Sequence, residues 1–132
     1  MMNVNVQVWD GFWTVDDCRQ NPRSLFVFGD NLIGKGKRGQ AVIRGEPNAI
    51  GIPTKKTPRL VESAFFTDDE LAGNMLVIYA ARDRVLKLLG DGQYCELVLP
   101  ADGWGGGLAQ LPEKAPRTYE IVRGVYEAFL NR

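Results

Sequence analysis

The chain has 132 residues, of which 45% are hydrophobic and 24% are charged, and this size and composition fit one globular domain over residues 1–132. Sixteen basic and sixteen acidic side chains give a formal net charge of zero, which argues against a protein that holds nucleic acid mainly through bulk positive charge. A local basic patch at Lys35, Lys37, Arg38 and Arg44 stays open. The chain has no histidine, so histidine general bases and histidine metal ligands are excluded. Cys18 and Cys95 lack the spacing of a zinc or redox motif, and we expect two reduced thiols, no metal site and no cofactor.

The sequence carries no sign of export or of membrane insertion. Its first ten residues lack the basic stretch and apolar core of a signal peptide. No apolar run approaches the roughly 20 residues that a membrane-spanning helix needs. We therefore expect a cytoplasmic protein that does not enter a membrane.

The first third of the chain predicts two strands and a short helical turn. Alternating valines across Asn3–Trp9 are typical of a half-exposed strand at the edge of a sheet. Thr14 is placed to cap a helical turn that runs to Cys18. Leu25–Phe28 is apolar without alternation, which predicts a central strand covered on both faces. We expect this strand to break at once into the turn Gly29–Asp30–Asn31.

The middle of the chain predicts a short helix, a strand and a long helix. Gly39–Arg44 has room for a short helix before the next glycine and proline. Ala49–Ile52 reads as a second buried strand. Thr67, with Glu70 three residues later, has the spacing of a capping box. Apolar residues at intervals of three and four then predict a long helix over Asp69–Leu89.

The last third predicts a third strand, a loop and a closing helix. Cys95–Leu99 is a further apolar strand, and the glycine-rich segment Asp102–Leu108 follows it. Pro112 and Pro116 bracket a predicted turn, and Arg117–Leu130 has the pattern of an amphipathic helix. Because strands alternate with helices, we expect an α/β fold with a mostly parallel central sheet and helices on both faces.

Two glycine-rich loops directly follow predicted strands. The first interleaves glycines with basic residues, as Gly34, Lys35, Gly36, Lys37, Arg38 and Gly39, and the second runs from Gly103 to Gly107. Ligands of parallel α/β sheets bind beyond the carboxyl ends of the strands, so we expect both loops to present backbone N–H groups to one anionic ligand there. Simpler interpretations stay open: a flexible basic loop, a turn that needs positive φ, and a Trp104 that either covers a nucleotide or plugs the core.

Three segments resemble the macrodomain family, whose members bind ADP-ribose: FVFGDNLIGKGKRGQA, GIPTKK and LPADGWGGGLAQL. They lie in the family's order and span Leu25 to Leu111. GIPTKK resembles the branch that removes ADP-ribose from protein glutamates or from thymidine in DNA. The pattern FGDN…GGQA…NAxGIPTK also looks like that of small phage and bacterial proteins. The resemblance implies a compact three-layer sandwich that binds ADP-ribose or a related NAD-derived nucleotide.

The resemblance also implies roles for single residues. Lys55 would attack or polarise the anomeric carbon, and Asp30 and Asn31 would face the distal ribose. Apart from the resemblance, Asp30, Glu46 or Asp102 could act as the acid/base partner of Lys55 if the fold brings one within reach, and Asp30 is our second catalytic candidate. Asp10 would stand in for the aspartate that contacts adenine. The other candidate ligand-binding residues are Gly29, Gly34, Gly36, Gly39, Gln40, Ala41, Thr54, Gly103, Trp104, Gly105, Gly106, Gly107 and Leu108.

The chain departs from the hydrolytic branch at Ala109, where that branch has an aspartate. A positioned acid or base contributes about 10²–10⁴-fold to a rate, so this replacement puts hydrolysis in doubt. Several functions stay open on the sequence alone: a nucleotide-binding protein that hydrolyses ADP-ribose from protein or DNA, a non-catalytic nucleotide sensor or sponge in phage–host conflict, and a structural or interaction domain.

Overall fold

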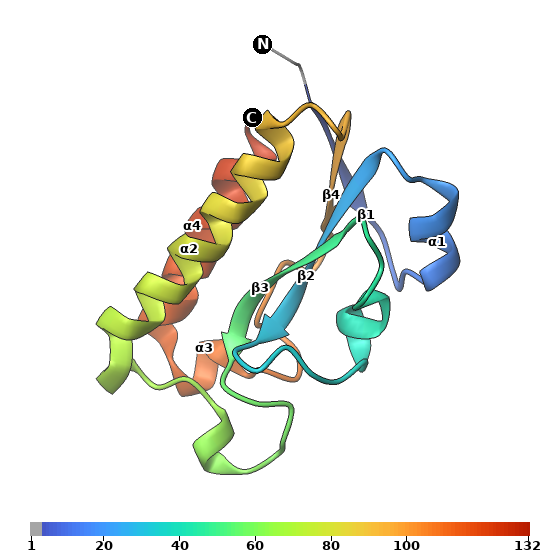
Figure 1. Ribbon diagram of the computed structural model, residues 1–132. Helices are drawn as coiled ribbons and strands as arrows, with labels where there is room; N and C mark the ends of the chain where they lie inside the picture. Colours follow the sequence, from blue (N-terminus) through green and yellow to red (C-terminus); the bar gives the residue numbers. More distant parts are fainter. Residues whose placement is uncertain (1–3) are drawn as a thin grey trace.

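A computed structural model describes residues 4–132, and Asn3 of the predicted first strand lies outside them (Figure 1). One sheet contains four parallel strands in the order β1-β4-β2-β3. The strands are β1 (Asn5–Trp9), β2 (Ser24–Asn31), β3 (Ala49–Lys55) and β4 (Glu96–Pro100). The parallel α/β fold is therefore confirmed, with β1 at an edge and β2 inside the sheet.

Helices cover both faces of the sheet and make three layers (Figure 1). The helices are α1 (Val15–Gln20), α2 (Leu71–Gly90), α3 (Leu111–Lys114) and α4 (Pro116–Leu130), with short 3-10 helices η1 (Gly39–Ile43), η2 (Glu62–Ala64) and η3 (Asp68–Glu70). The long helices α2 and α4 pack side by side on one face, and α1 and η1 lie on the other. Within residues 4–132, no helix is both long enough and apolar enough to cross a membrane.

Alternate side chains of β2 enter two separate cores. Leu25 and Val27 are fully buried with residues of α2 and α4. Phe26 and Phe28 point to the opposite face, where the rings of Trp13 and Phe26 meet edge to face with centroids 5.6 Å apart. Because both faces are covered, every position of this part of the strand is apolar, as the sequence predicted.

The predicted cap of α1 is confirmed. The Thr14 hydroxyl accepts a hydrogen bond from the Asp17 N–H at 3.2 Å, and the Asp17 carboxylate accepts one from the Thr14 N–H at 2.7 Å. This reciprocal pair satisfies two backbone donors at the start of the helix.

The predicted capping box of Thr67 and Glu70 is wrong. Thr67 makes no side-chain cap bond, Asp68–Glu70 forms the 3-10 helix η3, and α2 begins at Leu71. The Asp68 carboxylate turns instead to another helix, where it accepts the N–H groups of Arg117 at 2.9 Å and of Thr118 at 3.0 Å. Asp68 thus caps α4 across the fold, and this competing use explains why the local pattern misled.

Two strands run further than predicted. β2 continues through Gly29 to Asn31 because Gly29 and Asp30 pair in register with Ile52 and Pro53 of β3. Pro53 is tolerated within β3 because this strand lies at the sheet edge, where one side needs no backbone donor.

The predicted turn between Pro112 and Pro116 is also wrong, since this segment forms the short helix α3.

Candidate functional site

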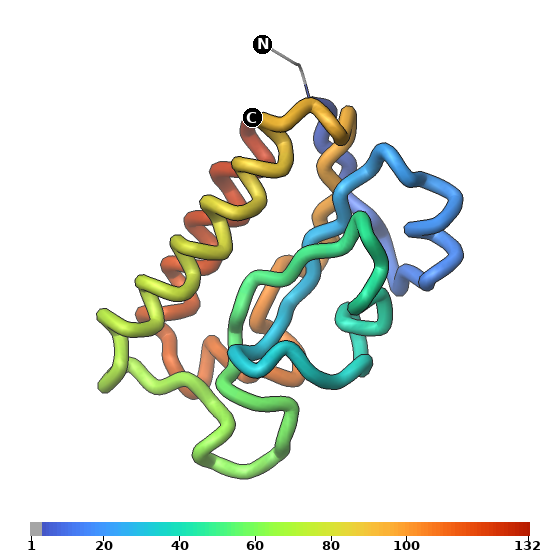
Figure 2. Tube along the Cα trace, viewed as in Figure 1, coloured from blue at the N-terminus to red at the C-terminus, as the bar shows by residue number. Residues whose placement is uncertain are grey.

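A cleft of about 400 Å³ lies beyond the carboxyl ends of the strands, lined by residues that follow each of the four strands. Figure 2 shows these connections gathered at one end of the sheet, with the segment that follows β3 extending below it. The predicted site residues that line the cleft are Gly29, Asp30, Asn31, Gly36, Gly39, Gln40, Ala41, Thr54, Lys55, Gly105, Gly107 and Leu108. Gly34, Gly103, Trp104 and Gly106 are not among the lining residues, and neither is Asp10.

The two glycine loops meet at this cleft, as the sequence predicted. Gly36 of the first loop and Gly105 of the second both line it. Both have positive φ, +94° and +89°, so a side chain would strain either turn. Gly105 has a further constraint, because the Leu111 side chain fills the space that a Cβ atom would need.

Both loops keep backbone N–H groups without an acceptor. Within residues 4–132, no backbone N–H group of residues 36–40 or 104–109 donates a hydrogen bond to another part of the chain. Backbone groups left unpaired by the protein are normally satisfied by water or a ligand. Successive free N–H groups in a loop can form a concave site for an anion. The loops therefore have the donors that the predicted anion site needs.

Lys55 ends β3 with its side chain largely enclosed. The residue is 6% exposed, its Nζ donates to the carbonyl oxygen of Arg59 at 2.6 Å, and the same Nζ lies 4.6 Å from the centre of the Phe65 ring. Burial, and then the positive charge of Arg38, lower the pKa of the Lys55 amine. Its neutral, nucleophilic form is thus more accessible than in an exposed lysine.

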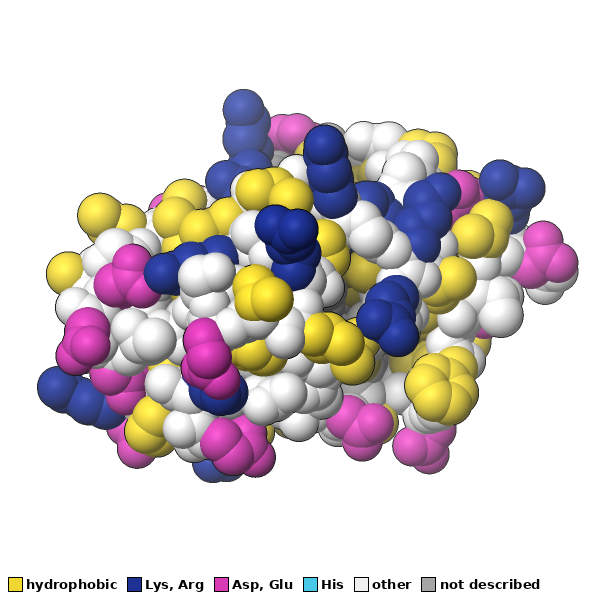
Figure 3. Space-filling view, turned by 90° about the horizontal axis from the view of Figure 1, so that it is seen from below, with side chains coloured by type: hydrophobic (Ala, Val, Ile, Leu, Met, Phe, Trp, Pro, Cys, Tyr) yellow, Lys and Arg dark blue, Asp and Glu magenta, His cyan; other side chains and the backbone are white. Residues whose placement is uncertain are grey.

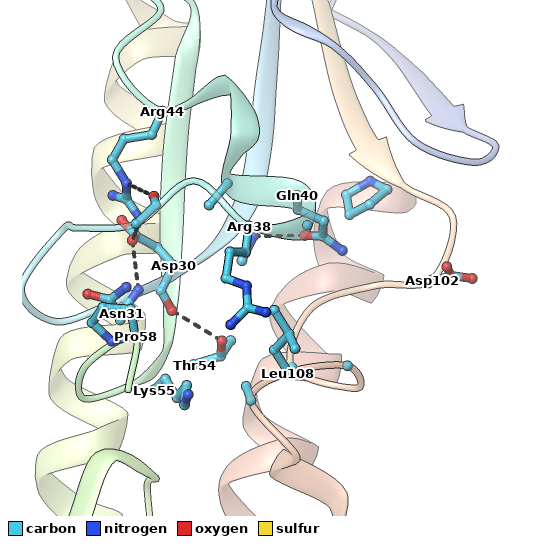
Figure 4. A pocket seen from close by; sticks show the side chains of 18 of the residues that line it. Asp30, Asn31, Arg38, Gln40, Arg44, Thr54, Lys55, Pro58, Asp102 and Leu108 are labelled. Carbon is cyan, nitrogen blue, oxygen red and sulfur yellow. Dashed lines mark hydrogen bonds and ion pairs between the residues drawn. The ribbon is translucent and has the colours of Figure 1, made fainter. Parts of the chain in front are cut away.

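Asp30 is committed to Arg44. Its Oδ1 accepts hydrogen bonds from the Asn31 N–H at 2.7 Å and from the Arg44 guanidinium at 2.5 Å, and the side chains of both Asp30 and Arg44 are less than one-fifth exposed. Arg44 also donates to the carbonyl oxygen of Gly36 at 2.7 Å. The pair therefore fastens the first loop to the end of β2 (Figure 4). This oxygen of the Asp30 carboxylate is therefore occupied by contacts within the protein.

Positive charge prevails in the cleft. Four basic side chains line it, Lys35, Arg38, Arg44 and Lys55, against two acidic ones, Asp30 and Asp102. Among the described residues, Arg38 and Lys35 have no ion-pair partner. In Figure 4, Arg38 reaches toward the middle of the cleft, while Asp102 lies well apart from Lys55.

The same charge pattern extends around the cleft. Figure 3 looks onto the edge of the sheet where the strands end, and its Lys and Arg side chains spread over the middle and upper part of that face. Asp and Glu side chains lie mostly toward its margin. A negatively charged ligand would approach this face favourably.

Trp104 belongs to the core. It is 2% exposed, its Nε1 donates to the carbonyl oxygen of Val27 at 3.0 Å, and its ring meets those of Tyr126 and Phe129 edge to face. Of the two alternatives for this residue, plugging the core is the correct one, and the structure gives it no place in the cleft wall.

Sequence reasoning missed several residues of the cleft. Phe12 is 92% exposed and lines the cleft beside the end of β1. Pro58 and Leu60 line it from the segment after β3, and Pro58 packs against Gly36. Their place could be inferred only in part, from the rule that loops after parallel strands share one edge of the sheet.

Within residues 4–132, no three Cys, Asp or Glu side chains come together as metal ligands. The cleft offers main-chain donors and cations, which suit an anion.

Residues 8–124 match the model of a family described as a family of unknown function (DUF7831). The chain belongs to this family. The part of this DUF7831 protein that matches contains both glycine loops and Lys55. No curated protein and no solved structure matches the chain. The relation to macrodomains stays a prediction.

Proposed function

We propose that this DUF7831 protein binds a nucleotide that carries a diphosphate, ADP-ribose or a related NAD-derived nucleotide, in the cleft at the ends of its strands. One observation carries the proposal: two glycine loops with unpaired N–H groups line the same cleft. Main-chain donors of this kind are suited to phosphate oxygens. The unpaired Arg38 supports the same conclusion, because a guanidinium is a preferred partner of phosphate.

The order of the strands gives the cleft a direction. Phe12 follows β1 at one edge of the sheet, and Lys55 ends β3 at the other. Parallel strands lie about 4.8 Å apart, so the three intervals between them span about 14 Å. A ligand with several groups in a row suits this length. We place the phosphates between the two glycine loops and the distal ribose near Lys55.

Hydrolysis of ADP-ribose from protein or DNA is the second candidate. It is favoured by Lys55, whose amine has a lowered pKa and lines the cleft. It is disfavoured because Lys55 has no ion-pair partner among the described residues, Asp30 is bound to Arg44, and Ala109 stands where the hydrolytic branch has an acidic residue. Binding in the cytoplasm, as a sensor or sponge for a nucleotide, is therefore the function we favour.

Calorimetric titration with ADP-ribose tests the binding. We expect wild-type protein to bind, and Arg38→Gln to weaken the affinity by a factor of about 10–150, since a hydrogen bond to a charged group contributes about 1.5–3 kcal/mol. Arg84→Gln is the matched control, because Arg84 is exposed on α2. Absence of heat from wild-type protein at millimolar ligand would exclude nucleotide binding of this kind.

Turnover separates the two candidates. Protein and DNA substrates that carry ADP-ribose are incubated with wild-type protein and with Lys55→Gln. If Lys55 is a nucleophile, wild type releases ADP-ribose and the variant does not, although both bind it. If neither releases ADP-ribose and both bind it, the protein is a binder and the hydrolase candidate is excluded.

A further inference from the structure

Gln40 connects the two glycine loops. Its Oε1 accepts the N–H of Gly29 at 2.8 Å, at the end of β2, and its Nε2 donates to the carbonyl oxygen of Gly103 at 2.9 Å, on the second loop. These partners lie 11 and 63 residues away in the chain. Figure 4 shows the side chain between the first loop and the segment after β4.

We propose that Gln40 is a positioning residue that sets the separation of the two loops, so that the cleft binds two linked phosphates much more tightly than one. The inference rests on the proposed function and specifies its ligand chemistry, a diphosphate held by both loops at once. It also gives Gln40 a role different from that of a direct phosphate ligand.

The chemistry of the amide explains why a glutamine stands here. One side of the side-chain tip must accept a hydrogen bond from an N–H group, and the other must donate one to a carbonyl oxygen. A side-chain amide does both without carrying a charge. Gly29 leaves room for the contact, because a Cβ atom on it would lie only 3.3 Å from Oε1. Gln40 is itself fixed, since its carbonyl oxygen accepts the indole N–H of Trp13 at 2.8 Å.

A ligand with one phosphate needs only one loop, whereas a diphosphate needs both at the correct distance. Linking two groups makes the second contact intramolecular, and this gain is lost when the two sites cannot be reached together. Loss of the Gln40 connection should therefore reduce the affinity for a diphosphate and leave that for a single phosphate almost unchanged.

The test compares inorganic pyrophosphate with inorganic phosphate by calorimetry. We expect wild-type protein to prefer pyrophosphate. In Gln40→Met, which keeps the length of the side chain and removes both hydrogen bonds, this preference falls about 30-fold, the effect of two lost bonds at about 1 kcal/mol each. Gln40→Asn retains the amide but is one methylene shorter and cannot reach both partners, so its preference should fall as well.

Val85→Ala is the control for general destabilisation, because Val85 is buried in α2 away from the cleft. It should lower the melting temperature and retain the preference for pyrophosphate. If the Gln40 variants lose affinity for both anions equally, or lose only thermal stability, Gln40 does not position the loops. Equal binding of both anions by wild type would also overturn the inference. If wild type binds neither anion but binds ADP-ribose, the inference fails and the proposed function stands; if it binds none of the three ligands, the proposed function itself fails.

Discussion

Asp68 should contribute more to stability than its exposed neighbour Asp69, because Asp68 caps α4, a helix that begins nearly fifty residues later. Its carboxylate accepts the N–H groups of Arg117 and Thr118 and also the Thr118 hydroxyl at 3.0 Å. Thr118 is fully buried, and its hydroxyl oxygen accepts from the Asn74 amide at 3.0 Å. Asp68 therefore ends a chain of hydrogen bonds that joins η3, α2 and α4.

The cost of Asp68→Ala can be worked out from these contacts. Loss of a helix cap costs about 1 kcal/mol, and loss of a negative charge at a helix N-terminus costs about 0.5 kcal/mol. The buried Thr118 hydroxyl then lacks an acceptor, which costs about 1 kcal/mol more. We expect a total of about 2.5 kcal/mol, or a fall of about 10 °C in melting temperature for a chain of this size.

Urea denaturation followed by tryptophan fluorescence measures this difference. Asp69→Ala is the matched control, because Asp69 is exposed in the same 3-10 helix, and surface changes of this kind stay within about 0.5 kcal/mol. Equal free energies of unfolding for the two variants would refute the reasoning.

The pH dependence of stability provides a second check of the Asp68 cap. Burial raises the pKa of Asp68, but hydrogen bonds from Arg117 and Thr118 and the charge of Arg117 outweigh it, so the net pKa lies below the ordinary 3.8. A carboxyl group with a lowered pKa in the folded state stabilises fully above its unfolded pKa and loses this effect as the pH falls through the folded value. The difference between wild type and Asp68→Ala should therefore be constant near neutral pH and shrink in acid, below pH about 4.

Two further predictions concern glycine and cysteine. Gly51→Ala should destabilise the protein by about 1–3 kcal/mol, because the new Cβ would overlap the Asp30 side chain. Gly73→Ala in α2, where nothing lies within 4 Å of the new Cβ, should raise the free energy of unfolding by about 0.5–1 kcal/mol in the same urea denaturation. A lower stability of Gly73→Ala, or an unchanged stability of Gly51→Ala, would contradict this reasoning. Burial raises the pKa of the Cys18 thiol to about 11, so iodoacetamide at pH 8 should modify exposed Cys95 alone in the native protein, as mass spectrometry would reveal.

The sequence predicted the fold wherever short-range pattern decides structure. The apolar run Leu25–Phe28 and the alternation before Trp9 identified a central and an edge strand, because burial on two faces or one face leaves a direct trace in composition. The two glycine loops were placed correctly at one edge, since this follows from parallel strands alone.

The errors arose where distant contacts decide. Thr67 and Glu70 have the spacing of a capping box, yet Asp68 between them is used by α4, which no local pattern indicates. The residues next to Trp104 in the sequence fit a nucleotide-covering ring and a core ring equally well. Only its packing against Tyr126 shows that it belongs to the core. The ion pair of Asp30 with Arg44 likewise depends on a distant contact, because the segment after β2 must fold back to bring Arg44 to the end of that strand.

The walls of the cleft come from loops after all four strands, so an occupant would contact four separate parts of the chain at once. Such an occupant binds the native state alone, and at a free concentration of 100 times its Kd it would add about 2.7 kcal/mol to the free energy of unfolding. This corresponds to an upward melting shift of about 10 °C for a chain of this length. A set of candidate nucleotides can therefore be ranked by thermal melting alone, without a label or an assumed reaction.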